Sequence, residues 1–454
     1  MRVYLDYAAT TPVDEEVFEA MKPYFSKDFG NPMALHAFGQ EARKAVEEAR
    51  AIIADHFEVS HEEIIFTSGA TESNNLAVKG IIGGMKHETW NMKHEAWNMK
   101  HETRDKFQET HQGEVEATRN KLQTRYNFPN SKFETQSKGV LPHIVTTAYE
   151  HHCLLDSVKS LVKSGEVEAT FVRPGKDGVI DPEKIQEAIK PNTVLVSVMQ
   201  VNNEIGTINP LSEIGKIVQK EKITRREKAG IAHKEALPIY FHSDITQGVN
   251  YLPFLAKEFN VDLFSLSGHK IYGPKGVGIL GVKKEVKLKR MQDGGAQEFG
   301  LRAGTHNVTG IVGIGKAVEN IKHEAWSRKH RKEVGDLRDY FWGKLQKEVK
   351  NVALNGSMEK RVVNNLNVSF KGVEGESLLM LLDMAGIACS TGSACGSESL
   401  EPSHVLLSLG LSHPDAHGSL RFTLGKGNSK EEIDYSVAEI KKAVEKLRKI
   451  AGVR

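Results

Sequence analysis

Lys270 lies in surroundings that favour chemistry. It belongs to the stretch 265–276, in which serines, a histidine and glycines surround it. Apolar runs at 261–264 and 277–282 flank this stretch, and both are typical of buried strands. Burial lowers the pKa of a lysine and makes its amine a usable nucleophile and base. Lys270 is therefore a candidate catalytic residue, although a loop lysine between two strands would show the same pattern.

A carboxylate upstream gives this lysine a specific role. Asp244 comes just after the apolar strand 238–241, and Lys270 comes after the next strand. Pyridoxal 5′-phosphate (PLP) needs two such groups, a carboxylate beside its pyridinium nitrogen and a lysine that forms a Schiff base. The pair predicts a PLP site with Lys270 as the Schiff-base residue.

The segment 63–78 has the pattern of a phosphate site. A short apolar strand at 63–67 leads into the small and polar residues 68–75, and an apolar helix is expected from 76 onward. The free N–H groups and the dipole of a helix N-terminus favour an anion, and Thr71 would add a hydroxyl group. An ordinary capped helix after a strand would look the same.

The chain has three cysteines, a small and odd number that does not suit a disulfide framework. Their spacing also fits no common four-ligand zinc site. Cys395 lies in the small-residue stretch 388–399, which predicts an exposed loop, and it is the candidate nucleophile. Cys389, beside apolar residues, is expected to be packed.

The overall composition predicts a large enzyme with two domains. Of 454 residues, 39% are hydrophobic and 26% are charged, and the formal net charge is only +2. This balance gives no argument for direct nucleic-acid binding or for an anionic membrane as partner. The start of the chain lacks a signal-peptide core, and no apolar run reaches membrane-spanning length. A cytoplasmic location is expected.

Apolar strands that alternate with helices indicate the fold class. Runs at 143–147, 169–172 and 193–199 read as strands of a mostly parallel α/β sheet that is covered on both faces. Ligands bind beyond the carboxyl ends of such strands. The phosphate candidate, His151, Asn203, Asp244 and Lys270 all lie there. The last third of the chain predicts a smaller α+β part.

Residues 84–139 interrupt this alternation. A seven-residue motif repeats from Met85, but its apolar residues do not form a coiled-coil seam. We expect a polar insertion. His87, His94 and His101 recur every seven residues, which suggests a repeated polar surface more than a metal site, so no resident metal is predicted.

Taken together, several motifs resemble those of cysteine desulfurases of the NifS/IscS type, in the class V branch of fold-type I PLP-dependent enzymes. The similarity covers nearly the whole chain outside 84–139, and it rests on residues 5–12, 67–75, 201–206, 267–274 and 393–395. It implies a mostly parallel seven-stranded sheet in a large domain, 14–325. Residues 1–13 and 326–454 would form the small domain, which carries the catalytic-cysteine loop.

The resemblance also implies a role for each matching residue. Lys270 would bind PLP covalently, Asp244 would hold the ring nitrogen, and His151 would stack on the ring and act in catalysis. Asn203 and Gln247 would bond the phenolic oxygen. The phosphate would lie against Ala70, Thr71, Ser267 and His269, with Thr305 reaching in from the second subunit of a homodimer. Arg421, with Asn203, would bind the substrate carboxylate through its forked guanidinium.

The implied reaction converts L-cysteine into L-alanine and leaves a persulfide on Cys395. The sulfur would pass to an iron–sulfur scaffold protein or a tRNA-thiolation enzyme, and Cys395 would be able to ligate or supply a nascent iron–sulfur cluster. A selenocysteine lyase or a class V aminotransferase is the alternative within PLP chemistry. A non-catalytic sulfur carrier, with the insertion as its docking arm, is the alternative outside it.

Overall fold

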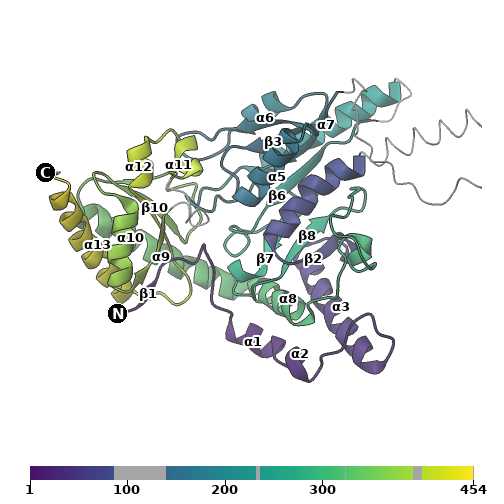
Figure 1. The fold of residues 1–454 in the computed structure, drawn as a ribbon, viewed down its shortest axis with the longest axis horizontal. Coiled ribbons are helices and arrows are strands. Elements are labelled where there is room, and N and C mark those ends of the chain that lie inside the picture. The colour runs from purple at the N-terminus through teal and green to yellow at the C-terminus, as the bar shows by residue number, and fades with distance from the viewer. Residues whose placement is uncertain (86–139, 232–235, 323, 392–400, 453–454) are drawn as a thin grey trace, which may run out of the picture.

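The computed structural model describes residues 1–85, 140–231, 236–322, 324–391 and 401–452 (Figure 1). Its largest element is a seven-stranded sheet. In spatial order the strands are β2 (Ile64–Thr67), β8 (Gly278–Val282), β7 (Leu263–Ser267), β6 (Tyr240–Asp244), β5 (Thr193–Ser197), β3 (His143–Thr147) and β4 (Glu168–Val172). Only β8 runs antiparallel to its two neighbours. The predicted mostly parallel, seven-stranded α/β sheet is confirmed.

Both faces of this sheet are buried because successive residues of each strand join different hydrophobic clusters. In β7, Phe264 packs into one cluster and Leu263 into the other. The first cluster includes side chains of α1 (Glu15–Met21), α3 (Ala37–Phe57), α6 (Pro182–Ala188), α7 (Leu211–Ile231) and α8 (Val308–Lys322). The second includes side chains of α5 (His152–Lys163) and of the helix over residues 70–85.

Small residues let α3 and α8 pack closely. A Cβ atom on Gly315 would lie 2.8 Å from the Cβ atom of Ala49, so a larger side chain would push the helices apart. The buried residues Ala42, Val46, Ile53 and others of α3 recur at helical spacing. Side chains of both helices pack in the same hydrophobic cluster as Phe66 of β2 and Ile279 of β8, so this helix pair covers one face of the sheet at that edge.

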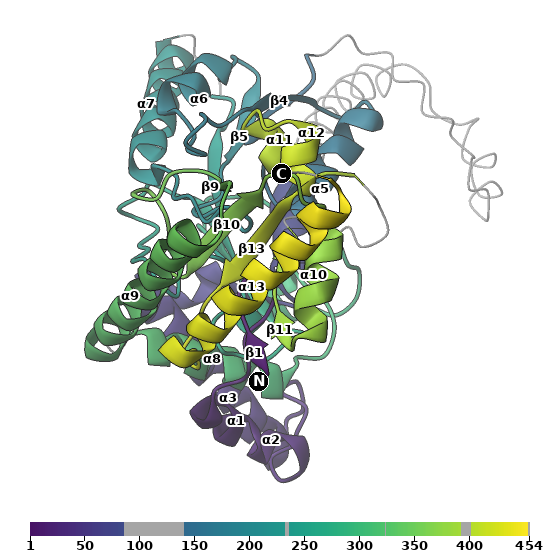
Figure 2. The same ribbon diagram turned by 90° about the vertical axis from the view of Figure 1, so that its left-hand side faces the viewer.

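A second, antiparallel sheet lies apart from the first and has a hydrophobic cluster of its own. Its strands, in order, are β12 (Ser390–Thr391), β13 (Ser419–Thr423), β10 (Asn365–Phe370) and β9 (Val352–Leu354). Figure 2 shows α9 (Glu324–Glu348), α13 (Lys430–Ile450) and α10 (Gly375–Met384) in front of β10 and β13. This is the smaller α+β part that the sequence predicts. The exact division into domains at 14 and 325 stays a prediction.

The N-terminal segment links the two sheets. β1 (Val3–Tyr4) pairs in parallel with β11 (Ile387–Ala388), and Asp6 forms a bridge with Thr423 of β13.

Short helices complete the described chain: α2 (Pro23–Ser26), α11 (His404–Ser408), α12 (His413–His417) and 3₁₀ turns at His61–Glu63, Gly268–Lys270 and Glu298–Gly300. No helix in the described ranges is long and apolar enough to cross a membrane.

Two local expectations meet different outcomes. The helix expected from 76 onward already begins at residue 70. Glu72 explains the early start, because its carboxylate accepts a hydrogen bond of 2.7 Å from the Ser68 N–H just before the first turn. Most of the predicted insertion, 86–139, with its repeat and three histidines, lies outside the described residues.

Candidate active site

A cavity of about 640 Å³ opens where the carboxyl ends of the parallel strands face the N-terminal segment and β13. Its wall combines residues from the N-terminal segment, from the ends of several strands of the seven-stranded sheet, from α11 and from β13. The predicted site residues that line it are Ala70, Thr71, His151, Asn203, Asp244, Gln247, Ser267, His269, Lys270 and Arg421. Thr305 is not among the lining residues of its own chain, and Cys395 lies outside the described residues.

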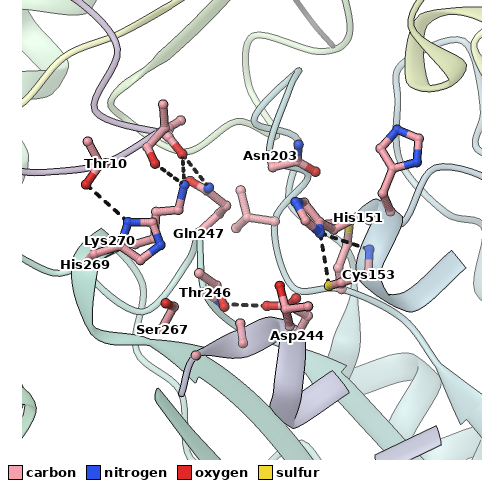
Figure 3. Close-up of a pocket in the computed structure, with 18 of the residues that line it drawn as sticks. Thr10, His151, Cys153, Asn203, Asp244, Thr246, Gln247, Ser267, His269 and Lys270 are labelled. Carbon is pink, nitrogen blue, oxygen red and sulfur yellow. Dashed lines mark hydrogen bonds between the residues drawn. The ribbon is translucent and has the colours of Figure 1, made fainter. Parts of the chain in front are cut away.

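Lys270 is the last residue of the 3₁₀ turn that follows β7. Its Nζ donates hydrogen bonds to the main-chain carbonyls of Ala8 and Ala9, the latter at 2.7 Å. Gln247 donates to the same Ala8 carbonyl at 3.1 Å. Figure 3 shows the lysine on one side of the cavity, with Asp244 and His151 across from it. The N-terminal segment therefore holds the amine at the cavity wall.

Asp244 ends β6 and is buried, with 6% of its surface exposed. One carboxylate oxygen accepts the Thr246 N–H at 3.0 Å, and the other accepts the Asn74 side-chain amide at 2.7 Å. These two neutral donors stabilise the charged carboxylate without neutralising it. Asp244 can therefore supply a fixed negative charge to a cationic ring nitrogen.

His151 caps the N-terminus of α5, and its Nδ1 accepts the Cys153 N–H at 3.2 Å. The Cys153 thiol lies 3.0 Å from the same nitrogen. Burial lowers the pKa of His151, and the nearby Asp244 charge opposes that shift. Burial, aided by the Asp244 charge, raises the pKa of Cys153 to about 12. A neutral imidazole beside a protonated thiol is the favoured state at neutral pH.

Another part of the cavity wall is formed by the turn between β2 and the helix over 70–85. A Cβ atom on Gly278 would lie 2.5 Å from the Gly69 Cα, so the turn lies directly against β8 because residue 278 is a glycine. The first N–H groups of a helix lack partners within the helix and attract anions. Ser267 lies beside this turn, since its Oγ would be 3.6 Å from a Cβ atom on Gly69, and His269 lines the same cavity. Burial and the charges of two nearby lysines lower the pKa of His269 to about 4, so it is neutral near pH 7.

Arg421 lies in the middle of β13, and its side chain is only 3% exposed. Its guanidinium donates to the Asn203 carbonyl at 2.9 Å and to the Asp6 carboxylate at 2.8 Å. Its Nε, and the side-chain oxygen of Asn203, are buried and make no hydrogen bond within the described residues. Unsatisfied buried polar atoms are uncommon, and two of them at one cavity indicate a polar ligand.

Thr305 is exposed, on a segment that a buried ion pair holds in place. Glu298 pairs with Arg50 at 2.8 Å and with His306 at 2.8 Å. Burial alone would raise the pKa of Glu298, but these partners outweigh it and lower the pKa to about 2. The segment that carries Thr305 is therefore anchored, while Thr305 itself is exposed and does not line the cavity of its own chain.

Three residues near the cavity have no role in the sequence-based prediction. Asn74 lies within a motif that the prediction uses, and Cys153 comes two residues after His151. His404 begins α11, its Nε2 donates a hydrogen bond to the Glu150 main-chain carbonyl at 3.0 Å, and its ring centroid lies 4.6 Å from that of His152. No local pattern indicates this last contact, which joins residues far apart in the chain.

Comparison with known proteins agrees with this geometry. The chain matches the family Aminotransferase class-V over residues 3–96 and 85–435. It is similar to the cysteine desulfurase IscS of Dictyoglomus turgidum, 41% identical over 449 residues that cover 99% of this chain and 96% of that protein. The cysteine desulfurase IscS of Rickettsia conorii is 42% identical over 452 residues, with 99% and 92% covered.

Solved structures give the same result. A NifS-like protein superposes with a TM-score of 0.77 at 31% identity, covering 98% of this chain and all of that one. SspA in complex with cysteine superposes with a TM-score of 0.69 at 31% identity, covering 93% and 99%. The chain therefore belongs to the class-V aminotransferase family of PLP-dependent enzymes, in its cysteine desulfurase branch.

Proposed function

We propose that this protein is a cysteine desulfurase that converts L-cysteine into L-alanine and retains the sulfur as a persulfide on Cys395. One observation carries the proposal. Lys270, Asp244 and His151 line the same cavity as Arg421, in a chain whose relatives are named cysteine desulfurases. A similar solved structure, SspA, was determined in complex with cysteine.

The cavity fits PLP. The turn before residue 70, with Ala70, Thr71, Ser267 and His269, would hold the phosphate. Asp244 would lie at the ring nitrogen, His151 against the ring face, and Asn203 and Gln247 at the phenolic oxygen. Lys270 would bind the cofactor through its amine. When bound, PLP supplies an electron sink that stabilises negative charge at the substrate Cα.

The protein's own groups would perform the remaining steps. Arg421 would bind the substrate carboxylate with its fork, which Asp6 and the Asn203 carbonyl already hold in place. Lys270, released from the Ala8 and Ala9 carbonyls, would remove the Cα proton and hold it. The Cys395 thiolate would attack the substrate sulfur, so that the C–S bond breaks and an S–S bond forms on the enzyme. A proton added at Cβ, and the return of a proton from Lys270 to Cα, would then complete alanine.

A homodimer would complete the site. Thr305 would reach the phosphate of the partner's PLP, which agrees with its exposure on an anchored segment. Exposed apolar side chains of the N-terminal part, including Phe25, Phe29 and Leu35, would be covered in such a dimer. Light scattering should then give twice the chain mass, and Thr305→Ala should weaken PLP binding. A monomer that binds PLP normally would contradict this part of the proposal.

The acceptor of the sulfur would be an iron–sulfur scaffold protein or a tRNA-thiolation enzyme in the cytoplasm, with Cys395 as donor. Incubating the enzyme with ³⁵S-cysteine and each class of acceptor tests this directly. Label should appear on an acceptor thiol with wild-type protein and not with Cys395→Ser. Label transfer that persists in the variant would remove Cys395 from this role.

The main experiment is an absorbance spectrum of the purified protein, followed by L-cysteine addition. We expect a visible band of bound PLP, and sulfide and alanine in equal amounts under reducing conditions. Cys395→Ser should keep the band and lose both products. If the variant stays active, a selenocysteine lyase or aminotransferase reaction is favoured instead, and if no PLP binds, the catalytic proposal fails.

A further inference from the structure

Four side chains form a continuous hydrogen-bonded line along one wall of the cavity. The Asn74 amide nitrogen lies 2.7 Å from the Asp244 carboxylate and 3.1 Å from the Cys153 sulfur. That sulfur lies 3.0 Å from Nδ1 of His151. The line joins β6, the helix over 70–85 and the start of α5. Figure 3 shows Asp244, Cys153 and His151 close together at this wall.

The direction of the first two bonds follows from their chemistry. A carboxylate can only accept hydrogen bonds, so the amide nitrogen of Asn74, and not its oxygen, must face Asp244. The same –NH₂ group has a second hydrogen, which is directed to the Cys153 sulfur. Asp244 therefore orients Asn74, and Asn74 occupies an acceptor position of the sulfur.

The direction of the last bond follows from the backbone. The Cys153 main-chain N–H points at Nδ1 of His151 at 3.2 Å, which requires an unprotonated nitrogen there. The sulfur already accepts from Asn74, and its contact with the Thr71 hydroxyl lowers the thiol pKa, as a hydrogen bond donated to the sulfur does. Its other neighbour on this line, Nδ1, is an acceptor. The thiol hydrogen must then lie between Sγ and Nδ1. The raised pKa of Cys153 and the lowered pKa of His151 agree with a neutral donor and a neutral ring.

We propose that Cys153 is a positioning residue for His151: its S–H, oriented by Asn74 and Asp244, donates to Nδ1 and holds the imidazole as the Nε2–H tautomer. The ring that faces the cofactor side of the cavity is thereby tied to the carboxylate that would hold the pyridinium nitrogen. The benefit to turnover rests on the proposed function, because a fixed neutral ring can pack on PLP and donate from Nε2. The hydrogen bonds themselves do not depend on that function.

Nitrogen NMR of the full-length protein, labelled with ¹⁵N-histidine, tests the proposal with and without PLP. The His151 signals are assigned by their absence in His151→Gln. Wild type should show the Nε2–H tautomer. Because the lost donor stabilised the neutral ring, Cys153→Ala should raise the His151 pKa by at least about 0.5 unit. Cys153→Ser keeps a hydrogen-bond donor and should restore the wild-type pKa of His151. Cys389→Ala, the matched control, should leave that pKa unchanged.

The charged and titratable groups that act on His151, besides Cys153, are Asp244, Lys270, His152, Arg421 and His404, and all five are unchanged in the cysteine variants. A pKa shift can therefore be assigned to the thiol. The proposal would be overturned if the His151 pKa were unchanged in Cys153→Ala, or if it shifted equally in Cys153→Ala and Cys153→Ser. A wild-type Nδ1–H tautomer would also overturn it.

The infrared S–H stretch gives an independent result on wild type, even if a variant folds poorly. The band that disappears in Cys153→Ser should lie at lower frequency than the band lost in Cys389→Ser, because a donating S–H bond is weakened. Equal frequencies would show that Cys153 does not donate. Neither spectrum requires turnover, so an inactive protein would contradict the proposed function and leave this inference to be decided by the spectra.

Discussion

The two sheets contribute to the cavity in different ways. In the seven-stranded sheet, Asp244 and Ser267 are the last residues of β6 and β7, and Lys270 follows three positions later. In the four-stranded sheet, Arg421 lies in the middle of β13, opposite Asn367 of β10. One sheet supplies groups where its strands end, and the other supplies a charge from within a buried strand.

This difference shows how each end of the site is held. At a strand end the backbone leaves the sheet, and polar side chains can reach a ligand without crossing the core. A charge within a strand is costly to bury unless partners satisfy it. Arg421 obtains its partners, Asp6 and the Asn203 carbonyl, from segments outside its own sheet. The cofactor end should therefore depend on one sheet, and the substrate end on contacts between the two.

Lys270→Ala should have the largest effect, at the cofactor end. We expect loss of the visible PLP band and a fall in sulfide formation of at least about 10³-fold, because nucleophile and base are removed together. Absorbance and a sulfide assay measure both. Lys284→Ala, at an exposed ion pair, is the control and should behave as wild type. Retained PLP with near-normal turnover would remove Lys270 from the mechanism.

Arg421→Ala should impair substrate binding at one end of the cavity and leave cofactor binding at the other end intact. PLP should still bind, while kcat/KM for L-cysteine falls about 10²-fold, chiefly through KM, because a buried charged contact to the substrate is lost. Arg421→Lys should recover little, since an ammonium cannot form the forked contact. Steady-state kinetics and a PLP titration give the answer. Equal loss of cofactor binding would show that the two ends are not separable.

Glu204→Gln tests the contact between the sheets. The Glu204 carbonyl accepts from Asn365 and Asn367 of β10, and its buried carboxyl group accepts from Ser403. Burial raises its pKa from 4.5 to about 7, against the opposing effects of Ser403 and Arg421. Between these values the folded chain holds a proton that the unfolded chain has released, so stability should fall as pH rises from 4.5 to 7.

Urea unfolding at pH 5 and pH 7.5 measures this effect. The free energy of unfolding of the wild type should fall by about 2 kcal/mol between these pH values because of the Glu204 carboxyl group. Glu204→Gln should not show this fall. Glu298→Gln is the control with the opposite shift. The pKa of its carboxyl group is about 2 in the folded chain and 4.5 in the unfolded chain, both below the two pH values, so the variant should be destabilised about equally at each. A pH slope unchanged by Glu204→Gln would contradict the prediction.

Asp6→Asn should have the smallest effect, at the substrate end. The amide still fills the space beside Arg421 but no longer orients it by charge, so KM for L-cysteine should rise about 3- to 10-fold with kcat nearly unchanged. Asp14→Asn is the matched control, because Asp14 pairs with Lys426 at 2.5 Å and has similar exposure. A changed kcat with a constant KM would place Asp6 elsewhere in the mechanism.

Most of the fold and much of the site could be predicted from local patterns. Apolar runs predict β5, β6 and β7, and polar residues after them predict Asp244 and Lys270 at one edge. The early start of the helix over 70–85 could not be predicted in this way, because residues 70–75 are small or polar and show no apolar periodicity. His404 could not be predicted either, since its contact with the Glu150 carbonyl joins positions 254 residues apart.

The sequence by itself predicted the alternation of strands and helices and the polar side chains that follow the strand ends, because these depend on short-range periodicity and residue type. The tertiary structure alone decided which partners hold those groups. Arg421 and Asp6 are 415 residues apart, and Asn74 and Cys153 are 79 apart. Such pairs form only when separate elements pack together, and their geometry decides which atom donates and which accepts.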